Sequence, residues 1–125
     1  MIEEINDEIH FHYEIETTYK HNTYLKDWLT ATATQEGKSI GEINYIICDD
    51  AYLLEINKNY LNHDTLTDII TFDYCEDNRL NADIYISIER VEDNSKMLNN
   101  KFIDEFERVC VHGILHLSGY KDKSE

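Results

Sequence analysis

The stretch HGILHLSGYKD, residues 112–122, closes the last predicted helix of the chain. Its two histidines, His112 and His116, are four residues apart, so both imidazoles lie on one face of a helix and can reach one ion. Gly119 can then turn the chain through a left-handed conformation that other side chains find costly. That turn would bring Asp122 back beneath the two rings.

Two nitrogens and one carboxylate oxygen, with a fourth position left open, is how catalytic zinc is usually held. We therefore predict that His112, His116 and Asp122 bind one Zn²⁺ ion. The spacing alone also fits a helix with two polar surface histidines and a glycine cap. A water on such a zinc ion would have its pKa lowered far below that of bulk water. This chemistry supports hydrolysis of an ester, an amide or a phosphodiester.

The residue after the first histidine argues against peptide hydrolysis. Metalloproteases with an HExxH motif place their general base there, and this chain has Gly113 instead. Glu105, nearer the N-terminus of the same helix, is a candidate base, although a solvated helix charge is the favoured interpretation. The sequence thus assigns no catalytic residue beyond the groups that hold the metal.

Hydrophobic periodicity extends the prediction outward from this helix. The strands 69–72 and 82–88 are close in sequence and separated by a turn at 77–81, which predicts a hairpin and one antiparallel pair. Residues 62–68 are polar and predicted to form a loop. We expect one α+β domain spanning residues 1–125. Its predicted elements, in order, are a strand (8–16), a helix (19–35), a strand (40–48), a helix (51–61), two strands (69–72 and 82–88) and two helices (89–98 and 102–117).

Two features of the N-terminal half bear on the site and the core. His10 and His12 lie two apart on the polar face of the first strand, and a solvated strand face is favoured there over a metal site, because no third ligand is near in sequence. Trp28 is predicted to anchor the first helix in the core.

Composition places the chain among globular proteins. Its 125 residues, 42% of them hydrophobic, suffice for one core of ordinary size. No apolar run approaches the roughly 20 residues that span a bilayer, and the N-terminus lacks the features of a signal peptide. Cys48, Cys75 and Cys110 are odd in number and widely spaced, which predicts buried thiols in a cytoplasmic protein.

The net charge of -15 opposes general attraction to nucleic acid. Any contact with RNA would have to be local, or be shared with a partner.

Three stretches together resemble the YbeY family of bacterial rRNA maturation factors. HGILHLSGYKD is similar to the family signature HGxLHLxGYDH. Residues 57–60 through 67–72 are similar to an asparagine–tyrosine run that ends in TDVLSF, and residues 82–87 are similar to a GDIxIS strand.

The resemblance implies a mixed four-stranded sheet with helices packed around it and a C-terminal metal-binding helix facing a cleft. It also implies a zinc-dependent, single-strand-specific endoribonuclease that processes ribosomal RNA and meets components of the small ribosomal subunit. His112 and His116 carry over directly as zinc ligands.

This chain departs from the family pattern at two positions. Asp122 stands where the family has the third histidine, and Leu61 stands where it commonly has an arginine that would contact phosphate. A charged phosphorane needs such a cation. Other basic residues could supply it: Lys58, Arg79, Arg108, Lys121 or Lys123. The alternative functions are a metal-dependent hydrolase of another substrate, such as a peptide, and a non-catalytic module that binds ribosomal components.

Overall fold

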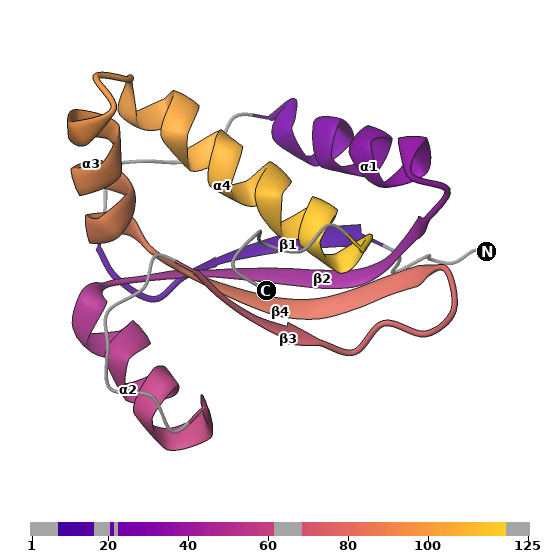
Figure 1. Ribbon diagram of the computed structural model, residues 1–125, viewed down its shortest axis with the longest axis horizontal. Helices are drawn as coiled ribbons and strands as arrows, with labels where there is room; N and C mark the ends of the chain where they lie inside the picture. Colours follow the sequence, from indigo (N-terminus) through magenta and orange to yellow (C-terminus); the bar gives the residue numbers. More distant parts are fainter. Residues whose placement is uncertain (1–7, 17–20, 22, 62–68, 120–125) are drawn as a thin grey trace.

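The computed structural model describes residues 8–16, 21, 23–61 and 69–119. Within these residues the chain alternates strands and helices around one sheet, as Figure 1 shows. The elements are β1 (Glu8–Tyr13), α1 (Leu25–Gln35), β2 (Ser39–Cys48), α2 (Asp50–Leu61), β3 (Ile69–Asp73), β4 (Arg79–Ser87), α3 (Ile88–Met97) and α4 (Phe102–Leu117).

The four described strands form one mixed sheet in the order β1-β2-β4-β3. β1 pairs with β2 and β2 pairs with β4 in parallel, whereas β3 pairs with β4 antiparallel. The predicted α+β class and the predicted hairpin are therefore confirmed. The predicted loop at 62–68 lies outside the described residues.

Three element boundaries differ from the sequence prediction by more than one residue. β1 ends at Tyr13 rather than at residue 16, and α1 begins at Leu25 rather than near residue 19. β4 begins at Arg79, inside the predicted turn, because the hairpin continues to a reciprocal pair of hydrogen bonds between Glu76 and Arg79. The turn itself is thus confined to two residues, and Asp77 has a positive φ of 54°.

The sheet buries its two faces unequally. α1 and α4 lie on one side of it, while α2 covers part of the other (Figure 1). Side chains alternate along each strand, so one face of β2 and β4 joins the core beneath α1 and α4. The fully buried members of this core with the largest side chains are Tyr45, Phe106, Ile9, Leu25, Leu29, Ile43, Ile47, Leu80, Ile84, Ile86 and Ile114.

The predicted role of Trp28 as a core anchor is wrong. α1 buries Leu25, Leu29 and Ala33, which are spaced four residues apart and form the inner stripe of the helix. Trp28 lies beside that stripe, is 43% exposed and has its ring 6.4 Å from that of Tyr24. A stripe of smaller side chains lets α1 pack against the sheet and leaves the indole at the surface.

Gly113 allows α4 to approach the sheet closely. A β-carbon at this position would lie 3.2 Å from Cδ1 of Ile84 and 3.7 Å from Cδ1 of Ile69. Beside it, the buried hydroxyl of Tyr45 donates a hydrogen bond of 2.7 Å to the carbonyl oxygen of Cys110. These contacts fix α4 against β2, β3 and β4 at the residue next to His112.

Substitution of Gly113 by valine tests this contact. Although valine has the better helix propensity, overpacking against Ile84 should lower the free energy of unfolding by about 1–3 kcal/mol. The measurement is denaturant unfolding followed by circular dichroism. Asp104→Val, at an exposed position of the same helix, is the matched control. Equal losses in both variants would show that residue 113 does not limit the approach of α4.

Candidate active site on helix α4

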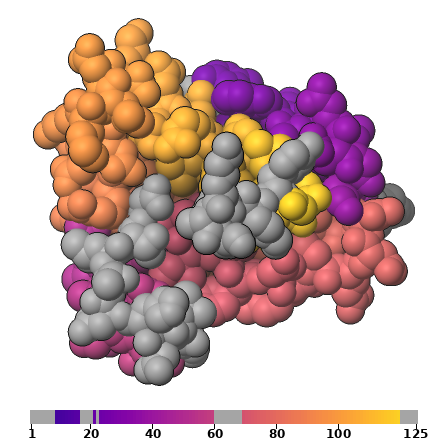
Figure 2. Space-filling model, viewed as in Figure 1, coloured from indigo at the N-terminus to yellow at the C-terminus, as the bar shows by residue number. Residues whose placement is uncertain are grey.

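His112 and His116 lie on the partly exposed side of α4. At 3.6 residues per turn they are about 40° apart around the helix axis and one turn apart along it. Both are only partly buried, at the border of the face that packs on the sheet. Part of the surface of α4 is visible between α3 and α1 in Figure 2. Both histidines therefore lie at the edge of the core.

The predicted turn after the helix is confirmed. Ser118 caps α4, and Gly119 has a φ of 118°, in the region that favours glycine. Asp122 lies outside the described residues. In the described part of the chain no group of three histidine, cysteine, aspartate or glutamate side chains could hold a metal. The structure thus places two of the three predicted ligands, and two imidazoles on one exposed stripe fit a site for Zn²⁺ that a further ligand would complete.

Glu105 is neither a solvated charge nor a base at this site. Its side chain is fully buried and forms a bidentate ion pair with Arg108, through Nε to Oε1 at 3.0 Å and Nη2 to Oε2 at 2.6 Å. It also lies seven residues before His112, which is about 10 Å along the helix axis. The sequence carried a signal for this pair, because residues three apart on a helix are neighbours.

A second buried carboxylate on α4 faces α1. Glu107 is 5% exposed and accepts a hydrogen bond of 2.7 Å from the hydroxyl of Tyr24. This bond joins residues 83 positions apart in sequence, so no local pattern could have predicted it. Glu105 and Glu107 are thus both buried and bonded to a partner side chain. Neither of these two carboxylates of α4 is available as a catalytic group.

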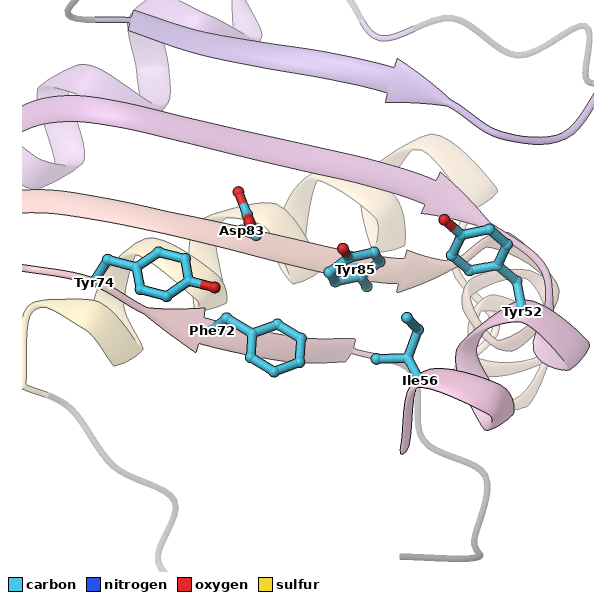
Figure 3. Close-up of a pocket in the computed structure, with 6 residues that line it drawn as sticks. All are labelled: Tyr52, Ile56, Phe72, Tyr74, Asp83 and Tyr85. Atoms are coloured by element: carbon cyan, nitrogen blue, oxygen red, sulfur yellow. The ribbon is translucent and has the colours of Figure 1, made fainter. Parts of the chain in front are cut away.

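A groove crosses the opposite face of the sheet, next to α2. Its cavity has a volume of about 370 Å³, and Figure 3 shows aromatic rings from two strands and from α2 around it. The rings of Phe72 and Tyr85 meet edge to face at 5.8 Å, and Tyr52 lies 6.3 Å from Tyr85. Sequence reasoning missed this groove; its signal was Tyr85, which stands between the buried Ile84 and Ile86 on β4 and therefore faces away from the core. Its lining residues are Tyr52, Ile56, Phe72, Tyr74, Asp83 and Tyr85.

Beyond the groove, polar side chains continue across the same face. His12 lies 3.0 Å from Asn44 Oδ1, and the Asn44 amide donates to Asp83 at 3.2 Å. His12 is exposed, which confirms the predicted polar face of the first strand. A neighbouring hollow of about 260 Å³ includes Glu42 and Asp83 in its lining. No lysine or arginine lines either hollow among the residues that the structure describes.

The cysteines do not contribute a nucleophile. Burial is the main cause that raises the pKa of Cys48 to about 12 and that of Cys75 to about 11, and it raises the pKa of Cys110 well above its ordinary value. Cys48 and Cys110 are buried as predicted, whereas Cys75 is only partly buried. Since the thiolate is the reactive form, these thiols are inert at neutral pH.

Thiol titration checks this conclusion. At pH 8 the thiolate fraction of Cys75 should be about one in a thousand, given a pKa of about 11. We therefore expect the folded protein to react with an aromatic disulfide reagent far more slowly than the protein in guanidinium, where three thiols should react. The rate in the folded state should rise as the pH is raised toward 11. One thiol that reacts in the folded protein as fast as in guanidinium would contradict this assignment.

Comparison with known proteins agrees with the geometry. A family model described as Endoribonuclease YbeY matches residues 4–125. A protein of that name from Flavobacterium johnsoniae is 56% identical over 94% of this chain and 84% of its own length. Another from Karelsulcia muelleri is 45% identical, over 94% and 83%. The solution structure of TM1509 from Thermotoga maritima superposes with a TM-score of 0.65 at 31% identity, over 94% of this chain and 76% of the other.

Proposed function

The chain belongs to the YbeY family of endoribonucleases, and from this premise we propose that it cuts single-stranded ribosomal RNA at a zinc ion held by His112, His116 and Asp122. Cleavage of an RNA phosphodiester bond is the activity that the family name states. The metal, its ligands, the single-stranded substrate and the ribosomal source of the RNA are the proposal. The observation that carries it is the pair of histidines on the partly exposed edge of α4.

The donor set fits zinc better than it fits magnesium or calcium. Imidazole nitrogens suit zinc, whereas magnesium and calcium prefer oxygen ligands. A bound zinc ion would lower the pKa of a water and stabilise negative charge on the phosphate being attacked. His112 and His116 would supply two ligands from one rigid helix, and Asp122 would supply the third from the segment after Gly119.

The sequence and the structure both disfavour a peptide as substrate. A protease would need a general base next to the metal, and Gly113 occupies the position where the HExxH enzymes carry theirs. Glu105, the candidate base on the same helix, is buried against Arg108. In phosphodiester hydrolysis, by contrast, the metal itself can stabilise the developing charge.

The proposed setting is ribosome maturation in the cytoplasm, with components of the small ribosomal subunit as partners. None of the helices in the described part of the chain has the length and apolar character of a membrane-spanning segment. With a net charge of -15, the protein would gain little from long-range attraction to RNA. Local contacts at the site and partners on the ribosome would therefore have to place the RNA.

Metal analysis tests the ligands. Protein purified without chelators should contain close to one equivalent of zinc, and His112→Ala and His116→Ala should lose it. Loss of a direct ligand should weaken binding by more than the roughly 10–100-fold caused by loss of an outer-shell partner. His12→Ala, an exposed histidine on the other sheet face, should retain full zinc content. Zinc that stays bound in both α4 variants would refute this site.

The third ligand and the activity are tested together on a labelled single-stranded rRNA fragment. Wild type and Asp122→His should cut it, because imidazole and carboxylate are both zinc ligands. Asp122→Ala should cut slowly and regain rate with excess zinc, and His116→Ala should not cut. Equal cutting by wild type and His116→Ala would point to a contaminating nuclease. Zinc-loaded wild type that leaves all RNA intact would contradict the enzyme proposal.

A further inference from the structure

A fixed cation beside the metal adds to the stabilisation of negative charge on RNA phosphates, and Leu61 occupies the position where the family resemblance expects an arginine. The chain has 11 lysines and arginines against 26 aspartates and glutamates. Several described cations are already paired with carboxylates elsewhere. Arg90 bonds both Asp50 and Asp93, and Lys96 lies 3.6 Å from Glu92.

Arg108 is the cation that shares a helix with the histidines. It precedes His112 by four residues, which places it about 6 Å away along the axis and about 40° around it. Its side chain is 56% exposed. The ion pair with Glu105 holds the guanidinium toward the N-terminal end of α4, farther from His112 than the backbone of Arg108 is, so it can reach a phosphate next to the one at the histidines. Residues 105, 112 and 116 fall within about 40° of one another, so the pair and the histidines share one side of the helix.

The ion pair presents its positive end to solvent. Glu105 is fully buried and Arg108 is more than half exposed, so an approaching phosphate meets the guanidinium before the carboxylate. Glu105 engages the Nε and Nη2 donors, and a guanidinium has five N–H donors in a planar fork. A guanidinium that a carboxylate already holds in place loses less side-chain entropy when it binds an anion. Arginine also binds phosphate in a bidentate manner.

The charges on the rest of the described surface also favour RNA binding along α4. Asp83 and Glu42 line the hollows on the opposite sheet face, and no described lysine or arginine does. On α4 itself, Asp104 is exposed and lies one turn before Arg108. Its negative charge repels RNA phosphates, so RNA binding is not favoured N-terminal to Arg108. The stripe from Arg108 to His116 is thus the part of α4 suited to RNA.

We propose that Arg108, held in place by Glu105, binds the RNA phosphate adjoining the one cut at His112 and His116. This inference rests on the proposed endoribonuclease function and assigns to Arg108 the phosphate contact for which Leu61 has no charge. Its consequence is a substrate contact that contributes to binding with or without the metal.

Arg108→Gln alone is not a suitable test, because it would leave the buried carboxylate of Glu105 without its cation. An uncompensated buried charge strongly destabilises the fold. The decisive comparison is therefore wild type, which has the ion pair, against the double variant Glu105→Gln with Arg108→Gln, which removes both charges and leaves the net charge unchanged. Glu105→Gln alone keeps the cation without the carboxylate that holds it. Arg108→Lys in the wild-type background keeps the charge without the fork. Lys101→Gln, a cation at the N-terminal end of the same helix, is the matched control.

Affinity for a fluorescent single-stranded RNA is measured by anisotropy over a range of salt concentrations, with the protein kept metal-free by a chelator. Loss of one phosphate contact should reduce the slope of log affinity against log salt by about 0.7. We expect that change between wild type and the double variant, with a raised KM in the zinc-loaded double variant. Arg108→Lys should keep most of the slope, and Lys101→Gln should match wild type.

Equal salt slopes and equal KM values for wild type and the double variant would overturn the assignment and show that Arg108 only neutralises Glu105. A slope reduced as much by Lys101→Gln would overturn it too, because the contact would then be diffuse. These outcomes differ from failure of the enzyme proposal, in which zinc-loaded wild type would leave the RNA uncut.

Discussion

The close contact of α4 with the sheet is the constraint on which the site depends. Residue 113 lies over Ile84, where even a β-carbon would be tight at 3.2 Å. Tyr45 then reaches the carbonyl oxygen of Cys110 from below, which satisfies a buried hydroxyl that would otherwise cost stability. Because this contact is next to His112, the backbone that carries the histidines is held by the core, although their rings lie at its edge.

The buried carboxylates of α4 explain how a chain with a large negative charge can still present a surface suited to RNA. Glu105 and Glu107 point away from solvent and are each bonded to a partner, Arg108 and Tyr24. The remaining negative charge is spread over other surfaces, including the hollows beside Asp83. Electrostatic binding is a local property at physiological salt, where the Debye length is about 8 Å. A net charge of -15 is therefore compatible with an RNA site on one stripe of one helix.

The sequence was most informative where the signal was local. Helical spacing in residues 102–117 and the nearness of β3 to β4 predicted helix α4 and the hairpin, since both depend on short-range periodicity and turns. The prediction for Trp28 failed because the pattern does not say which of two neighbouring apolar stripes packs inward. The bonds from Tyr45 to Cys110 and from Tyr24 to Glu107 join residues 65 and 83 positions apart. Only the folded topology brings such pairs together.

The two departures from the family pattern change the electrostatics of the site in the same direction. An aspartate as third ligand adds a negative charge that a histidine would not, and a metal so ligated is a weaker Lewis acid. Leucine at position 61 leaves out a positive charge that would face the phosphate. Both changes reduce the stabilisation of a phosphorane, whose charge must be met by fixed groups. The proposed contact of Arg108 with the adjoining phosphate would offset part of these losses through substrate binding. The proposed roles of Asp122 and Arg108 are therefore linked: the more firmly the aspartate is a ligand, the more the site depends on the arginine.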